Sequence, residues 1–185
     1  MSRRDGNADD VAVVLESSRL LLRRLSENDA EDLAGIYSDP EVMRYILPPC
    51  ADPVERARSC IEEQQRLYAE RGFGLWATVY KRNDALIGRC GLLPWEIGGS
   101  REVELGYLLA KRYWGLGLAT EAAIAVRDHA FENLGLTRVV CQVHPGNIAS
   151  QRVAEKCGMK REGDVDVCGV PCRIYAMGDS AKENK

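Results

Sequence analysis

The chain has 185 residues, 45% of them hydrophobic, and a formal net charge of −3. This length and hydrophobic share suit one compact domain with a sizeable core. The small net charge gives no basic stripe and argues against a nucleic-acid partner, and the only early apolar run, 11–15, is too short for a signal sequence or a membrane span.

The chain divides into a polar N-terminal arm, 1–18, one domain, 19–178, and a charged tail, 179–185, and we expect the arm to be flexible and the tail frayed. The domain opens with a strand-forming run. Three helix-start signals follow, each a Ser or Asp side chain that can cap a helix. The elements predicted in this half are a strand at 19–25 and helices at 26–37, 40–47 and 53–71. Pro48 and Pro49 close the second helix.

The second half of the domain alternates strand-forming runs with two helices. A turn at 82–84 joins the first two strands into a hairpin, and Gly98-Gly99-Ser100 makes the next turn. The predicted strands are 75–80, 85–94, 103–109, 138–143, 159–167 and 173–177, and the predicted helices are 118–134 and 147–157. Leading helices, a central meander and a strand-helix-strand unit indicate a mixed α/β domain.

Two glycines, Gly115 and Gly117, stand between a predicted strand and a long amphipathic helix. Without a Cβ, the backbone can turn tightly there and bring N–H groups against an anion, which the positive end of the helix also favours. The pattern therefore predicts a phosphate-binding loop. It lacks the spacing of a mononucleotide P-loop. A dinucleotide-binding oxidoreductase, the alternative on local pattern, would need Gly or Ala at Thr120 and an acidic residue where His144 stands.

The run from Arg112 to Gly117 resembles the Arg/Gln-x-x-Gly-x-Gly/Ala motif of the GNAT superfamily of N-acetyltransferases. Further matches resemble the RimJ/RimL branch, which acetylates the N-termini of ribosomal proteins, and extend from about Arg19 to Met177. These matches lie at 19–25, 39–45, 104–107, 114–122 and 147–159. The resemblance implies a central, mostly antiparallel sheet flanked by helices.

The resemblance also implies acetyl-CoA as the co-substrate and an amine as the acceptor, either a small-molecule amine or the N-terminus of a ribosomal protein or other peptide. Asn147 would touch the pantetheine arm, and a backbone N–H around Leu108 could donate to the thioester oxygen. The residues expected to bind the cofactor are Leu108, Leu109, Ala110, Arg112, Gly115, Leu116, Gly117, Leu118, Ala119, Thr120 and Asn147. Asn147 is also a good helix N-cap, and Arg112 can equally be a solvated side chain.

Acetyl transfer needs an uncharged amine, yet an alkylamine has a pKa of ~10.4 and an α-amine of ~8. A carboxylate that accepts the proton contributes roughly 10² to 10⁴ in rate. Strand alternation puts Glu102, Glu104 and Gly106 on one face, and Gly106 leaves space beside Glu104. The resemblance carries the family's general base onto Glu104. The alternative is that both glutamates simply face solvent.

The departing thiolate needs a proton. In many relatives a tyrosine supplies it, but the matching position here is Ala154. The Asn-x-x-Ser motif of the RimJ/RimL-like branch is matched by Ser150, whose hydroxyl is the candidate donor, although serine is common in the first turn of a helix without any such role. Neither His129 nor His144 has a nucleophile at suggestive spacing, so we expect direct attack in a ternary complex. A non-catalytic acyl-CoA-binding module is the other alternative.

The seven cysteines are scattered and show no paired Cys-x-x-Cys pattern, which favours a reducing, cytoplasmic setting. Cys168 and Cys172 lie close together, but two ligands do not complete a zinc site. We therefore expect no bound metal, no membrane partner, and a monomer or homodimer.

Overall fold

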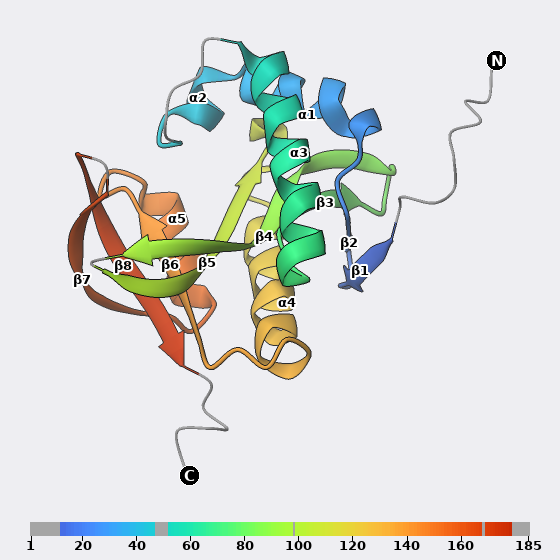
Figure 1. Cartoon of the computed structure of the whole chain (residues 1–185). Coiled ribbons are helices and arrows are strands. Elements are labelled where there is room, and N and C mark those ends of the chain that lie inside the picture. The colour runs from blue at the N-terminus through green and yellow to red at the C-terminus, as the bar shows by residue number, and fades with distance from the viewer. Residues whose placement is uncertain (1–11, 47–51, 98, 168, 179–185) are drawn as a thin grey trace, which may run out of the picture.

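A computed structural model describes residues 12–46, 52–97, 99–167 and 169–178. The predicted tail, residues 1–11 of the predicted arm, and the predicted breaks at Pro48, Pro49 and Gly98 lie outside the described residues. In chain order the elements are β1 (Val13–Glu16), β2 (Leu20–Arg23), η1 (Glu27–Asp29), α1 (Ala30–Tyr37), α2 (Pro40–Met43), α3 (Pro53–Arg71), β3 (Leu75–Tyr80), β4 (Ala85–Ile97), β5 (Ser100–Leu109), η2 (Lys111–Tyr113), α4 (Leu118–Glu132), β6 (Arg138–Val143), α5 (Ile148–Lys156), β7 (Lys160–Val167) and β8 (Val170–Gly178) (Figure 1).

One eight-stranded sheet forms the centre of the molecule, in the order β1-β2-β3-β4-β5-β6-β8-β7. Neighbouring strands are antiparallel except β5 and β6, which are parallel. The mixed α/β prediction with a mostly antiparallel sheet is therefore confirmed. A dinucleotide-binding fold is built on a mostly parallel sheet, so the oxidoreductase alternative is wrong.

The first strand corrects the predicted extent of the N-terminal arm. Val13–Glu16, which sequence analysis placed in the arm, form β1 and pair with β2, with Leu15 opposite Leu22. The side chains of Val14 and Leu15 pack against the main hydrophobic cluster. The short apolar patch in this segment forms a strand here because pairing with β2 buries its surface against the rest of the domain.

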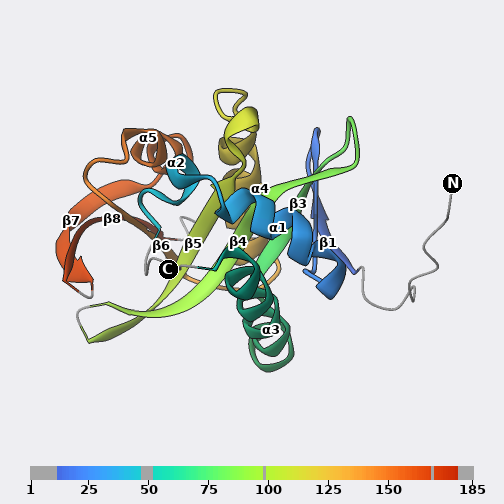
Figure 2. The same cartoon turned by 90° about the horizontal axis from the view of Figure 1, so that it is seen from above.

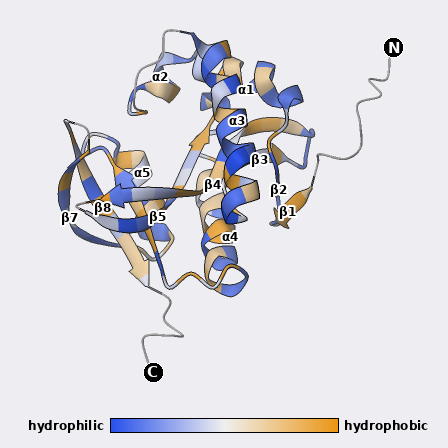
Figure 3. Ribbon diagram, in the orientation of Figure 1, coloured by the Kyte–Doolittle hydropathy of each residue, from blue (hydrophilic) through white to orange (hydrophobic). Residues whose placement is uncertain are grey.

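Helices cover both faces of the sheet, and each face has its own hydrophobic cluster. The larger cluster lies under α4 and α5 and includes Trp76 and Val126. The second lies under α1 and α3 and includes Leu33, Ile61 and Leu108. Figure 2 shows α3 and α4 on opposite sides of the sheet, and Figure 3 shows that the outward side of α3 is largely hydrophilic. Among the described residues, no helix is both long enough and apolar enough to cross a membrane.

The predicted helix boundaries follow from local capping contacts. Asp52 Oδ1 accepts hydrogen bonds from the N–H groups of Val54 and Glu55 at 2.9 and 3.2 Å, which fixes the start of α3. Gly72, at the other end, has φ of 76°, the left-handed conformation that ends a helix. These caps confirm the third predicted helix at both ends.

Candidate active site

The loop between β5 and α4 brings the predicted phosphate-binding residues together. Gly115 and Gly117 have φ of 74° and 76°, a region that side chains rarely adopt. A Cβ on Gly115 would meet nothing within 4 Å, so backbone conformation rather than crowding favours glycine there. Helix α4 begins at Leu118, directly after Gly117, and its first N–H groups have no partner within the helix. The loop and helix start therefore have the geometry of an anion site.

The other predicted loop residues divide between core and surface. Leu118 is buried in the main cluster and anchors the start of α4, while Leu116 is 51% exposed. Ala119 and Thr120, in the first helical turn, are half-buried. The exposed Arg112 places its guanidinium 5.1 Å from the ring centroid of Tyr113, so it lies beside the loop and stacks on its neighbour.

Strands β5 and β6 diverge close to Glu104. Within the described residues they share a single register pair, Glu104 with Val140. One step further, the Cys141 thiol donates to the carbonyl of Leu105 at 3.1 Å. The next N–H on β6, that of Gln142, donates to Glu104 Oε1 at 3.4 Å. The end of β5, residues 106–109, thus presents a backbone edge that β6 does not pair with, and an extended ligand can add to such an edge.

The predicted thioester donor around Leu108 faces away from this edge. The N–H of Ala110 donates to the carbonyl of Ile87 on β4 at 2.8 Å. Hydrogen-bonded pairs alternate along an antiparallel ladder, so Leu108, two residues earlier, also directs its backbone groups toward β4. A Cβ on Gly88 of β4 would collide with the Leu108 carbonyl oxygen, which agrees with this orientation. The Leu108 side chain is buried in the second cluster.

The same alternation directs the backbone groups of Tyr107 and Leu109 to the unpaired side of β5. The carbonyl of Leu109 accepts a hydrogen bond from Trp114 Nε1 at 2.7 Å, which shows that this side faces away from β4. The prediction is therefore displaced by one residue. The N–H groups of Tyr107 and Leu109, not that of Leu108, are in position to meet a ligand on the open edge.

Glu104 and Glu102 lie in different electrostatic environments. Glu102 forms an ion pair with Arg138, whose Nε lies 3.2 Å from Glu102 Oε1. Glu104 forms no ion pair with any described residue, and its carboxylate accepts only the N–H of Gln142. Burial raises the pKa of Glu104 to about 7, against the opposing effects of that N–H and of the Arg89 charge. Glu104 is therefore the carboxylate that can exchange a proton near neutral pH.

Ser150 meets a partner that sequence analysis did not identify. The Tyr107 hydroxyl donates to the Ser150 carbonyl at 2.9 Å and lies 2.9 Å from Ser150 Oγ. Burial raises the pKa of Tyr107 well above its usual value, so the phenol stays protonated. The alternation of side chains along the strand places Tyr107 on the face opposite Glu104, and this was the only feature of the sequence that could have pointed to a contact between Tyr107 and α5. Ala154, at the position of the relatives' tyrosine, is fully buried.

Asn147 holds Ser150 in place. Its Oδ1 accepts the N–H of Ser150 at 3.1 Å, which makes it the N-cap of α5. The structure thus shows the capping role, and the predicted contact with the pantetheine arm stays a prediction.

The two candidate proton-transfer residues lie on opposite faces of β5. Glu104 shares its face with Leu108 and the second cluster, whereas Tyr107 and Ser150 lie on the side of α4 and α5. On the Glu104 face, the ring of Tyr45 stacks on His144 with centroids 4.9 Å apart, so the segment after α2 closes over the end of β6. A ligand on the open edge would have the Glu104 carboxylate on one side and the two hydroxyls on the other.

A groove of about 730 Å³ lies between β1 and α4. Its lining includes Gly117, Thr120 and Glu121 but neither Glu104 nor Ser150, so it adjoins the glycine loop from the side away from the open edge of β5. We assign this groove no role in acetyl transfer, because a volume without a candidate catalytic side chain does not indicate one.

The expectations about metal ions and disulfides can be compared only with the described part of the chain. No group of three or more His, Cys, Asp or Glu side chains there could hold a metal ion. The cysteines described are free thiols, including Cys172. Its predicted neighbour Cys168 lies outside the described residues.

Comparisons with known proteins show the family to which the chain belongs. The family model described as an acetyltransferase (GNAT) domain matches residues 19–160. The chain is 33% identical over 162 residues to the uncharacterized protein YkkB of Bacillus subtilis, covering 87% of this chain and 93% of that one. It is 39% identical over 153 residues to the putative ribosomal N-acetyltransferase YdaF of the same organism, covering 80% and 81%. A crystal structure of an acetyltransferase from Agrobacterium tumefaciens is 26% identical and superposes with a TM-score of 0.78, covering 96% and 100%.

Proposed function

The chain belongs to the acetyltransferase (GNAT) family, and from that membership we propose that it transfers the acetyl group of acetyl-CoA to a primary amine by direct attack in a ternary complex. One observation supports this proposal most: Glu104, with its pKa near 7, stands where β5 and β6 diverge. An open strand edge beside a poised carboxylate suits an extended thioester and an amine that must lose a proton.

The donor would lie along three features already described. Its pyrophosphate would take the N–H groups of the glycine loop and the start of α4. Its pantetheine arm would add to the open edge of β5. The N–H groups of Tyr107 and Leu109 would then donate to the arm or to the thioester oxygen, stabilising the charge that develops there.

The amine nitrogen attacks the thioester carbonyl and forms the new C–N bond as the C–S bond breaks. The nitrogen's proton goes to Glu104, directly or through a water molecule. The sulfur leaves as a thiolate and takes a proton from Ser150 Oγ. Tyr107 lies 2.9 Å from that oxygen and stays protonated, so its hydroxyl can hydrogen-bond to Ser150 Oγ as the proton leaves. Water then returns a proton to Ser150, and Glu104 releases to water the proton that it took from the amine.

The acceptor is proposed from two observations. The relative YdaF carries the name of a putative ribosomal N-acetyltransferase, which makes an N-terminal α-amine of a ribosomal or other protein the first acceptor to test. The Arg89 charge acts on Glu104, and a cation near the base disfavours acceptors with several positive charges. A peptide α-amine or a small monoamine fits this environment better than a polyamine.

A panel of amines, read by release of free CoA thiol, tests the proposal. The expected result is turnover with peptide α-amines or small monoamines and weaker turnover with spermidine. Calorimetric binding of acetyl-CoA without turnover on any amine would instead favour the acyl-CoA-binding module. Failure to bind acetyl-CoA at all would overturn the proposed donor.

A further inference from the structure

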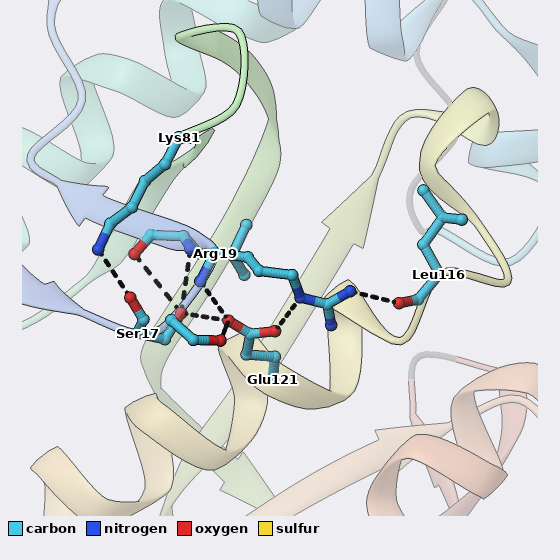
Figure 4. A network of polar contacts seen from close by, with 7 residues as sticks. Ser17, Arg19, Lys81, Leu116 and Glu121 are labelled. Carbon is cyan, nitrogen blue, oxygen red and sulfur yellow. Dashed lines mark hydrogen bonds and ion pairs between the residues drawn. The ribbon is translucent and has the colours of Figure 1, made fainter.

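The turn between β1 and β2 is bound to the first turn of α4 through Glu121. Glu121 Oε1 accepts hydrogen bonds from Ser17 Oγ at 2.7 Å, Ser18 Oγ at 3.0 Å and the backbone N–H of Arg19 at 2.8 Å. Glu121 Oε2 pairs with Arg19 Nε at 2.6 Å. Figure 4 shows these contacts converging on one carboxylate. They tie two segments that are about a hundred residues apart in sequence.

Arg19 extends this network to the glycine loop itself. Its Nη1 donates to the carbonyl of Leu116 at 3.0 Å, between the two left-handed glycines. Its Nη2 lies 3.6 Å from the position that a Cβ on Gly117 would occupy. One guanidinium therefore contacts both the loop and the helix that follows it (Figure 4). Neither sequence analysis nor the family motif at 112–117 gave Arg19 a role.

The electrostatics of the helix start explain why such a contact matters. Burial acts to raise the pKa of Glu121, but the hydrogen bonds from Ser17, Arg19 and Ser18 outweigh it and lower the pKa to about 2. Glu121 is therefore an anion at every physiological pH, one turn into a helix whose N-terminus would receive a phosphate. An uncompensated carboxylate there would repel that ligand. The Arg19 charge cancels it.

We propose that Arg19 is a positioning residue of the acetyl-CoA site, which holds the Leu116 carbonyl in place and neutralises Glu121 so that the glycine loop can bind the donor's pyrophosphate. This inference rests on the proposed function, because it presumes that acetyl-CoA is the donor. It assigns the β1–β2 turn a part in donor binding.

The experiment compares Arg19→Gln with the wild type on three thioester donors. These are acetyl-CoA, its 3′-dephospho form, which keeps the pyrophosphate, and S-acetyl-N-acetylcysteamine, which carries no phosphate. We expect the KM for the first two donors to rise by about tenfold at unchanged kcat, and kcat/KM for the phosphate-free donor to stay within about twofold, since Arg19 acts only through the pyrophosphate loop. Arg19→Lys, which keeps the charge, should restore part of the affinity.

Lys81→Gln is the matched control, because Lys81 donates to Glu16 and the Ser17 carbonyl in the same network but does not touch the loop. It removes the same unit of charge and should leave all three donors unaffected. An equal loss for all donors in Arg19→Gln would mean a merely structural role and would overturn the inference. A loss confined to acetyl-CoA would place Arg19 at the 3′-phosphate and also overturn it.

If Arg19→Gln does not fold, Arg19→Lys carries the same comparison of donors, with a smaller but still pyrophosphate-dependent loss expected. Calorimetric binding of acetyl-CoA to the wild type distinguishes failure of the proposed function from failure of the proposed role of Arg19. A wild type that does not bind acetyl-CoA contradicts the proposed function. A wild type that binds it while Arg19→Gln binds equally well contradicts only the role of Arg19.

Discussion

Glu104 Oε1 accepts the backbone N–H of Gln142 at 3.4 Å, across the point where β5 and β6 stop pairing. In a continuous parallel ladder that N–H would donate to a carbonyl of the neighbouring strand. A carboxylate side chain takes the place of that carbonyl here. The contact therefore marks the end of strand pairing and fixes the candidate base beside the open edge.

Glu104→Gln should lower kcat by roughly 10² or more at neutral pH while leaving acetyl-CoA affinity nearly unchanged. In the wild type, kcat/KM should rise with pH through about 7, because the pKa of Glu104 is raised to about 7 and only the ionised form accepts a proton. The variant should lack this step and keep only the rise due to the amine. Steady-state kinetics from pH 5 to 9 measure it. Glu102→Gln, which loses an ion pair with Arg138, is the control and should keep the step.

Glu104→Gln, which should lower kcat, should stabilise the folded protein at neutral and higher pH. Because the pKa of Glu104 is raised in the folded state, from 4.5 to about 7, folding favours the protonated form. The wild type therefore loses stability as pH rises from about 4.5 to about 7, by at most about 3.5 kcal/mol at about 1.4 kcal/mol per pKa unit. The melting temperature of Glu104→Gln minus that of the wild type should therefore be larger at pH 8 than at pH 5. A melting difference that does not vary with pH would show that Glu104 is ionised at little cost.

Gly117→Trp should weaken acetyl-CoA binding at least tenfold by calorimetry, because the new side chain would occupy the proposed pyrophosphate-binding position. In addition, the φ of 76° at this position disfavours any residue but glycine. Gly99→Trp is the matched control. Gly99 also has a positive φ, of 81°, with nothing within 4 Å of a Cβ, and it lies in the turn between β4 and β5. Equal affinity in the two variants would remove the glycine loop from the donor site.

Ser150→Ala should reduce kcat about tenfold where chemistry is rate-limiting, since the thiolate then leaves without a positioned proton. The loss is bounded because a thiol has a pKa of only ~8.5. Tyr107→Phe should give a smaller loss, and the double variant should lose less than the product of the two single effects if the hydroxyls act as one unit. A donor with a more acidic thiol should partly rescue Ser150→Ala. An unchanged kcat in Ser150→Ala would leave water as the proton source.

Much of the fold was predictable because its signals are local. Caps such as Asp52 and left-handed glycines such as Gly72 fix helix ends through contacts within a few residues, and the structure has the predicted helices and strands to within a few residues. The error at β1 has a different origin. Val13–Glu16 is too short to signal a strand alone, and it becomes one because Leu22 offers a partner across the sheet edge.

The candidate site divides in the same way. The sequence by itself predicted the glycine loop and the capping of α5 by Asn147, since these depend on backbone conformation and on a contact three residues away. Strand alternation placed Glu102 and Glu104 on one face, and the family resemblance chose Glu104 between them. Tertiary structure alone decided which backbone edge of β5 is open, and that moved the expected donor from Leu108 to its neighbours.

Tertiary structure alone also brought Tyr107 to Ser150 and Arg19 to the glycine loop, across 43 and 97 residues of chain. It likewise set the pKa of Glu104, because burial in the folded domain, not the identity of a carboxylate, raises it. Sequence patterns report interactions between near neighbours. The long-range contacts and the desolvation that prepare this site exist only once the two faces of the sheet have been covered.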